Sequence, residues 1–274
     1  MATLVSFHAH PDDESIATGG TMAKAAAEGH RVVLVVATRG ELGEPVPGVL
    51  AEDEQLWERR VAETERSAEI LGAKRVEFLG YEDSGMMGEP TNENVASFWQ
   101  ADVDEAAERL AEILREEQAD VLTVYDDHGG YGHPDHIQVH RVGVRAAQMA
   151  GVHRIFEGTM NRTRIREMVR SARDAGELTE APDVDGDQAG FGTEEEDITH
   201  SVDVSAFVDR KLESMKAHAS QIGPEHFFLT MPSEVFAAAF GQEWYIEHGA
   251  TRSPNEPFGA DLFAGLPDGA GESS

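Results

Sequence analysis

The sequence predicts an α/β fold, with a doubly wound, mostly parallel sheet flanked by helices and a smaller C-terminal elaboration. Short apolar runs without polar alternation recur along the first 160 residues, as expected of strands that are buried on both faces. Segments with helical periodicity separate these runs, and such alternation is typical of right-handed crossovers between parallel strands. With 274 residues, of which 40% are hydrophobic, the chain can bury a substantial core.

The expected elements follow one another in a regular order. Apolar runs over 3–8 and 31–37 predict two buried strands, and an alanine-rich helix over 16–28 separates them. A long helix over 51–71 ends at Gly72, because glycine readily adopts the left-handed conformation that closes a helix. The remaining elements are strands over 76–79, 120–125 and 154–158, and helices over 103–117 and from Pro134 to about 150. This order is that of a Rossmann-like sheet.

The pattern is weaker after residue 160. A helix is expected over 161–174, and another over 205–221. The stretch between them, 175–198, is acidic and rich in glycine, which predicts a flexible loop or lid. The tail from 251 is rich in Gly, Pro and Ser, and a terminal segment of this composition is often poorly ordered.

The composition disfavours several classes of protein. The formal net charge is −30 with only four lysines, whereas nucleic-acid binding needs clustered lysine and arginine. The acidic charge favours solubility, and adaptation to high salt stays an open alternative. The absence of cysteine excludes disulfides, thiolate metal ligands and a cysteine nucleophile. No apolar run is long enough for a membrane span and no signal peptide is visible, so a cytoplasmic protein is expected. The oligomeric state is left open, a homo-oligomer included.

Two similar turns follow two of the predicted strands. Residues 7–14 read FHAHPDDE, and residues 132–136 read GHPDH. Because ligands bind outside the carboxyl ends of parallel strands, the two turns should meet at one edge of the sheet. Each turn holds a proline suited to a first helical turn, followed by polar residues that would share one helix face. The spacing therefore predicts that His10 faces the same way as Asp13, and His133 the same way as His136.

The two turns together predict a metal site. Two histidines and one carboxylate, with an open position for water, are typical of catalytic zinc. His10, Asp13 and His136 are the candidate ligands, which leaves Asp12 free for another task. The same donor set also accepts Fe²⁺. One turn alone would be explained equally well by a structural histidine and a helix-capping aspartate, but two turns at equivalent strand ends favour a metal.

These residues carry a resemblance to a known family. HPDDE at 10–14 and HPDH at 133–136 resemble the LmbE-like (PIG-L) family of zinc-dependent N-deacetylases. Further stretches are similar to its actinobacterial mycothiol branch: GELGE at 40–44, Arg60 followed by Glu63, DSGM at 83–86, GGYG at 129–132 and, near the C-terminus, KAHASQ at 216–221. We accordingly expect a catalytic core over 1–160, a C-terminal part of the same domain over 161–250 that covers the active site, and a tail over 251–274.

The resemblance implies a hydrolase that removes the N-acetyl group from an N-acetylglucosamine-containing substrate, such as a glucosaminyl-inositol, through a zinc-bound water. The substrate would be a small acetylated amino sugar. His10, Asp13 and His136 would bind Zn²⁺, and Asp12 would act as general base toward the water.

The resemblance also implies roles for further residues. His133 would be the general acid or would stabilise the tetrahedral intermediate, and Asp135 would orient His133. The hydroxyl of Tyr131 would stabilise the oxyanion. Contacts to the sugar or its aglycone are assigned to Glu44, Arg60 and Asp83, although Arg60 with Glu63 also fits a surface ion pair. Weaker candidates near the site are His8, His128, His140 and His218.

Three alternatives share parts of this pattern. An amidase of a mycothiol-type S-conjugate, or a deacetylase of a natural-product intermediate, would use the same zinc core with a different pocket. A non-haem iron oxygenase also uses two histidines and a carboxylate, but those sites commonly lie in β-barrels and this chain has an α/β pattern. A binding protein without catalysis would keep the fold and the metal, yet every proposed catalytic residue is present here.

Overall fold

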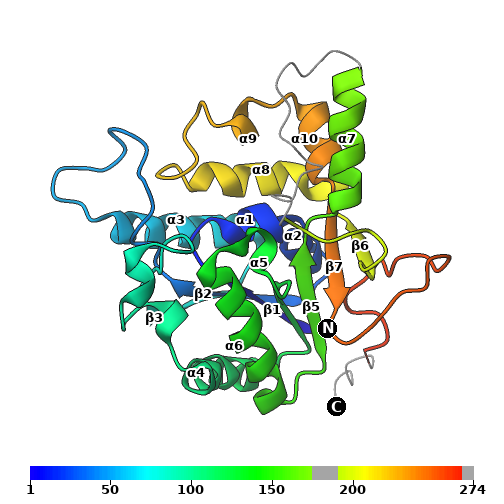
Figure 1. Ribbon diagram of the computed structural model, residues 1–274, viewed down its shortest axis with the longest axis horizontal. Coiled ribbons are helices and arrows are strands. Elements are labelled where there is room, and N and C mark those ends of the chain that lie inside the picture. Colours follow the sequence, from blue (N-terminus) through cyan, green and yellow to red (C-terminus); the bar gives the residue numbers. More distant parts are fainter. Residues whose placement is uncertain (175–190, 267–274) are drawn as a thin grey trace.

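A seven-stranded sheet forms the centre of the molecule (Figure 1), whose computed structural model describes residues 1–174 and 191–266. The strands are β1 (Thr3–His8), β2 (Arg31–Thr38), β3 (Arg75–Tyr81), β4 (Val121–Tyr125), β5 (Arg154–Thr159), β6 (His200–Asp203) and β7 (Gln242–Glu247). Their order in the sheet is β3-β2-β1-β4-β5-β7-β6. Strands β1 to β5 pair in parallel, whereas β7 pairs antiparallel to β5 and β6 antiparallel to β7. The predicted doubly wound, mostly parallel sheet is confirmed.

Helices cover both faces of the sheet (Figure 1). They are α1 (Asp13–Ala17), α2 (Gly19–Ala27), α3 (Leu56–Leu71), α4 (Val103–Glu116), α5 (Gly129–Gly132), α6 (Pro134–Ala150), α7 (Arg162–Asp174), α8 (Val208–Ala217), α9 (Phe227–Thr230) and α10 (Ser233–Phe240). Helices α4 and α6 pack on one face and α2 and α3 on the other, with α8 lying outside α1, α2 and α3. None of the described helices is long and apolar enough to cross a bilayer.

The alternation of side chains along β1 and β2 divides the core between the two faces. Val5 and Phe7 face the layer of α4 and α6, whereas Leu4 faces the layer of α2 and α3. All six residues of β1 are buried, which explains its continuous apolar run. Helix α6 comes very close to the sheet at Gly143, where a Cβ atom would lie 2.4 Å from a Val124 methyl. Glycine at this position therefore lets α6 pack against β4.

Several predicted boundaries move, for local reasons. The helix expected over 16–28 is divided into α1 and α2 at Thr18. The helix expected over 51–71 begins only at Leu56, because the Glu58 side chain accepts a hydrogen bond from the Gln55 backbone and closes the first turn. It ends as predicted at Gly72, which has a φ of 89°.

Of the predictions made for the C-terminal part, some are confirmed and others are incomplete. The helix over 161–174 is confirmed as α7, and the helix over 205–221 is shortened to α8 behind a 3₁₀ turn over Ser205–Phe207. Residues 175–190 of the predicted lid lie outside the described residues, while Thr193 forms a β-bridge with Asn161 after β5. Strands β6 and β7 and helix α10 were not predicted.

A buried ion pair joins the C-terminal elements to the N-terminal half. Lys211 of α8 donates a hydrogen bond to the Glu243 carboxylate of β7, and both side chains are buried. The same carboxylate accepts hydrogen bonds from the backbone amides of Gly20 and Thr21 at the start of α2, each at 2.8 Å, and from the Tyr245 hydroxyl. Strand β7, helix α8 and helix α2 thus share one carboxylate.

We expect Lys211→Met to lower the free energy of unfolding by about 3 kcal/mol or more, because it leaves the buried Glu243 charge without its cation. Urea unfolding measures this loss. Lys216→Met on the same helix is the control, since the exposed Lys216–Glu213 pair should contribute less than about 1 kcal/mol. Equal losses in the two variants would contradict the assignment of Glu243 as a shared anchor.

Candidate metal centre

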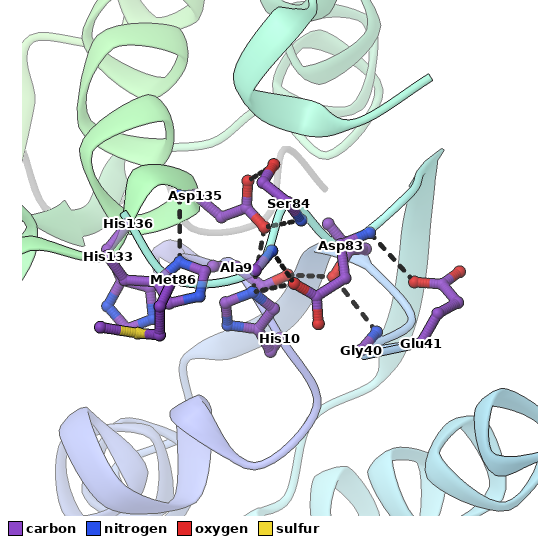
Figure 2. A network of polar contacts seen from close by, with 12 residues as sticks. Ala9, His10, Gly40, Glu41, Asp83, Ser84, Met86, His133, Asp135 and His136 are labelled. Atoms are coloured by element: carbon purple, nitrogen blue, oxygen red, sulfur yellow. Dashed lines mark hydrogen bonds and ion pairs between the residues drawn. The ribbon is translucent and has the colours of Figure 1, made fainter. Parts of the chain in front are cut away.

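The two predicted turns meet because the strands that precede them are neighbours. β1 pairs directly with β4 in the sheet, so the turn over 9–14 and the segment over 126–136 leave the same edge side by side. This is the switch point of the doubly wound sheet, where β1 is flanked by β2 on one side and β4 on the other. Figure 2 shows the side chains of His10, His133, His136 and Asp135 gathered there.

Two of the predicted ligands, His10 and His136, each lie beside the third, Asp13. Asp13 Oδ2 lies 3.3 Å from His10 Nδ1 and 3.4 Å from His136 Nε2. His136 Nε2 is buried and has no hydrogen-bond partner among the described residues. Buried polar atoms are normally paired, so a nitrogen left free beside a carboxylate fits a metal ligand. The ligand atoms of His10, His133 and His136 also lie within 4.8 Å of one another. The residues present therefore fit a divalent metal ion.

The turn before α1 holds an unusual backbone. Asp12 has a φ of 102°, which is costly for a residue other than glycine. Its carbonyl oxygen accepts hydrogen bonds from the Ser15 amide and hydroxyl, and its amide donates to Glu14 Oε2 at 3.1 Å. Pro11 lies in the turn ahead of α1, so the prediction that it occupies the first helical turn is wrong, whereas Pro134 does begin α6. The contact expected between His10 and Asp13 still forms, across the turn rather than along a helix.

The Asp12 carboxylate is held by Arg60. Arg60 Nη2 lies 3.3 Å from Asp12 Oδ2, and it also donates a hydrogen bond to the Pro11 carbonyl. Burial raises the pKa of Asp12 to about 6, with Arg60 opposing the rise and Asp13 adding to it. A carboxylate with a pKa in this range can take up a proton near neutral pH.

The Asp135 carboxylate contacts His10, one of the candidate metal ligands. Its carboxylate accepts hydrogen bonds from the Ser84 amide and hydroxyl and lies 3.1 Å from His10 Nε2 (Figure 2). A proton on Nε2 leaves the His10 Nδ1 lone pair facing Asp13, as a metal ligand requires. Asp135 is also bonded to His133, as expected of a residue that orients it, but through its backbone amide rather than its carboxylate.

His133 caps α6 and presents a donor. Its Nδ1 accepts a hydrogen bond from the Asp135 amide at 3.1 Å, so the neutral ring carries its proton on Nε2. Burial, together with the neighbouring His10 and His136, lowers the pKa of His133 to about 4. The side chain is therefore a neutral hydrogen-bond donor at physiological pH.

Tyr131 lies over the histidines on a short glycine-rich helix, α5. Its ring is half exposed, with its centroid 4.9 Å from that of His136 and 6.2 Å from that of His133. Gly129 has a φ of 70°, and a Cβ atom there would lie 2.8 Å from the Cβ of His136. Glycine is thus needed for this segment to approach the site.

The three residues predicted to contact substrate lie in different environments. Glu44 is exposed on the loop after β2. Arg60 is buried and donates hydrogen bonds to the Gly40 carbonyl, at 2.9 Å, and to the Pro11 carbonyl in the turn. The alternative pairing of Arg60 with Glu63 is not formed, because Glu63 binds the amide and hydroxyl of Ser220. Asp83 is buried, with Oδ1 3.6 Å from His10 Nε2.

The other histidines have separate contacts. His8 is buried beneath the site, where its Nδ1 lies 2.9 Å from the Tyr125 hydroxyl, and His140 is bonded to the Tyr125 carbonyl. His128 lies beside Asp127 at the surface, and His218 contacts Glu14. Sequence reasoning gave no role to Ser84 or Glu14; the only signal was their position inside the DSGM and HPDDE stretches.

Comparison with known proteins finds a matching family and near full-length relatives. A family model described as PIG-L, GlcNAc-PI de-N-acetylase, matches residues 5–147, which is more than half of the chain. A relative from Acidothermus cellulolyticus, named 1D-myo-inositol 2-acetamido-2-deoxy-alpha-D-glucopyranoside deacetylase, is 43% identical over 97% of this chain and 96% of its own.

Solved structures confirm the fold. The N,N'-diacetylchitobiose deacetylase from Pyrococcus horikoshii aligns with a TM-score of 0.59 at 19% identity, over 89% of this chain and 82% of its own. GalB, a 4-carboxy-2-hydroxymuconate hydratase from Pseudomonas putida, aligns with a TM-score of 0.57 at 18% identity, over 94% of this chain and all of its own. A hydratase shares this fold, so these two structures show the fold of the chain and not its activity. The family match and the near full-length relative carry more: the chain belongs to the PIG-L (LmbE-like) family.

Proposed function

We propose that this protein is a metal-dependent N-deacetylase that removes the acetyl group from the N-acetylglucosamine unit of a glucosaminyl-inositol. The observation that carries the proposal is the convergence of Asp13 Oδ2 with His10 Nδ1 and His136 Nε2, next to a second carboxylate with a raised pKa. The substrate class is inferred from the near full-length relative, whose name specifies deacetylation of a glucosaminyl-inositol.

His10, Asp13 and His136 would hold the metal, which we propose to be Zn²⁺; this donor set also accepts Fe²⁺. When bound, the metal would polarise the acetyl carbonyl and make a water molecule more acidic. Asp135 would keep His10 in the tautomer that presents Nδ1 to the metal. These residues therefore build the site without taking part in proton transfer.

The remaining residues would carry out the chemistry. Asp12 would accept a proton from the attacking water on its carboxylate and later return it to the leaving amine. His133 Nε2–H and the Tyr131 hydroxyl would donate hydrogen bonds to the acetyl oxygen as negative charge develops there. Glu44, Arg60 and Asp83 are proposed to form the sugar side of the site. Arg60 would act there through Asp12, to which it is bonded.

We expect the purified protein to release a primary amine from N-acetylglucosaminyl-inositol. Treatment with a chelator should abolish release, and added Zn²⁺ should restore it, because the metal both binds and activates the reactants. Amine detection with a fluorogenic reagent measures this. The metal-loaded protein could instead leave this substrate intact and hydrolyse a thiol conjugate. That result would contradict the proposed substrate but would still be consistent with the proposed metal centre.

We expect Asp12→Asn to lower kcat about 100-fold or more while metal content stays near one ion per chain, because an amide cannot accept the proton. Steady-state kinetics together with metal analysis measure the two quantities. Asp127→Asn is the control, since Asp127 is an exposed carboxylate close to the site in sequence. Unchanged turnover in Asp12→Asn would remove Asp12 as the base.

We expect Asp135→Asn to weaken metal affinity about 10- to 100-fold, the usual effect of removing a carboxylate behind a metal-binding imidazole. In the wild type the Asp135 carboxylate accepts hydrogen bonds from the Ser84 amide and hydroxyl and from His10. The amide of asparagine cannot accept all of these hydrogen bonds. Competition with a zinc-binding dye gives the affinity. A wild-type affinity would show that His10 does not depend on Asp135.

A further inference from the structure

The last acidic residue of the first motif, Glu14, has its own set of hydrogen-bond partners. Glu14 lies on α1 and is fully buried, with side-chain partners on α3 and at the end of α8. Its carboxylate accepts three hydrogen bonds: from the Ser67 hydroxyl of α3, from the Asp12 amide, and from His218 at the end of α8, at 2.6 Å. One donor from the motif itself and two from distant parts of the chain thus converge on one side chain, and a carboxylate has enough acceptor positions for all three.

His218 is the C-terminal member of this cluster. Its side chain has no solvent exposure, and its Nδ1 has no hydrogen-bond partner among the described residues, so its described polar contact is with Glu14. Burial lowers the pKa of His218, but the Glu14 carboxylate, with further help from Asp12 and Glu63, raises it above the ordinary value overall. A buried histidine placed against a buried carboxylate forms a charge-assisted hydrogen bond, which is stronger than a neutral one.

The cluster connects directly to Asp12. One Glu14 oxygen binds Ser67 and His218, and the other accepts the Asp12 amide. That amide belongs to the residue with a φ of 102°, a conformation that persists only where the surroundings enforce it. Arg60 restrains the same turn from the other side through the Pro11 carbonyl. Glu14 is therefore placed to fix the orientation of the Asp12 peptide, and His218 to fix Glu14.

We propose that His218 and Glu14 are positioning residues that hold the Asp12 turn in its left-handed conformation and so keep the Asp12 carboxylate beside the metal-binding residues. The inference rests on the proposed function, in which Asp12 is the base. In this proposal the C-terminal segment that holds His218 contributes to the reaction, although His218 itself is neither a proposed metal ligand nor a proposed catalytic residue.

The test compares His218→Ala with His218→Gln in the full-length, zinc-loaded protein. We expect His218→Ala to lower kcat about 10- to 100-fold with KM changed less than about twofold, because proton transfer is disturbed and substrate binding is not. His218→Gln keeps a donor near the position of Nε2 and should recover most of the lost kcat. Wild-type kcat in His218→Ala overturns the proposal, even if that variant unfolds more easily.

Ser220→Ala is the matched control. Its hydroxyl is also buried and also binds α3, but through Glu63 rather than Glu14. We expect this variant to lose stability in urea while keeping kcat within about twofold of wild type, as is usual for a substitution that removes one buried hydrogen bond away from the reacting groups. Equal losses of kcat in Ser220→Ala and His218→Ala would mean that His218 acts only through general packing.

A structural measurement separates this inference from the proposed function. Crystal structures of the wild type and of His218→Ala are compared at Asp12, whose φ we expect to leave the positive region in the variant. An unchanged Asp12 backbone overturns the inference whether or not the wild type is active. The wild type could bind metal without releasing amine while Asp12 is displaced in His218→Ala. This combination would overturn the proposed function but support the positioning role of His218 and Glu14.

Discussion

The pairing of β1 with β4 determines the distance between the two halves of the site. Its register, with Ser6 opposite Thr123, is held by hydrogen bonds between those two hydroxyls and, one step nearer the site, between His8 and the Tyr125 hydroxyl. A slip of one residue would turn every side chain to the opposite face. These buried polar contacts lie in the sheet close to the candidate metal ligands, because His8 is two residues from His10. They give the pairing a specificity that apolar packing alone would not provide.

The carboxylates around the site are individually expensive to bury, and each has its own partner. Asp13 faces two histidines, Asp135 binds Ser84 and His10, Asp12 meets Arg60, and Glu14 binds His218. In a chain with a net charge of −30, this arrangement still leaves His136 Nε2, beside the Asp13 carboxylate, without a hydrogen-bond partner among the described residues. A bound divalent ion would therefore also stabilise the folded state, by mass action.

Much of the fold was predictable because strands buried on both faces leave continuous apolar runs, as in 3–8 and 31–37. Strand β7 was not, since QEWYIE has polar residues at both ends around only three apolar or aromatic ones, and its partner β5 lies far away in the sequence. At the site, residue types at equivalent strand ends predicted which side chains meet. The partner of Asp135 and the burial of Arg60 were beyond such reasoning, because side-chain contacts between remote segments have no local signature.

The positive φ of Asp12 has an evolutionary consequence. Glycine, or asparagine to a lesser degree, would occupy that conformation at lower cost, so the most stable residue for the turn is not the one that the proposed chemistry requires. Drift toward stability at position 12 would yield folded, metal-binding, inactive descendants. Members of the family that have abandoned catalysis for binding could be recognised by such a replacement, with the surrounding metal ligands intact.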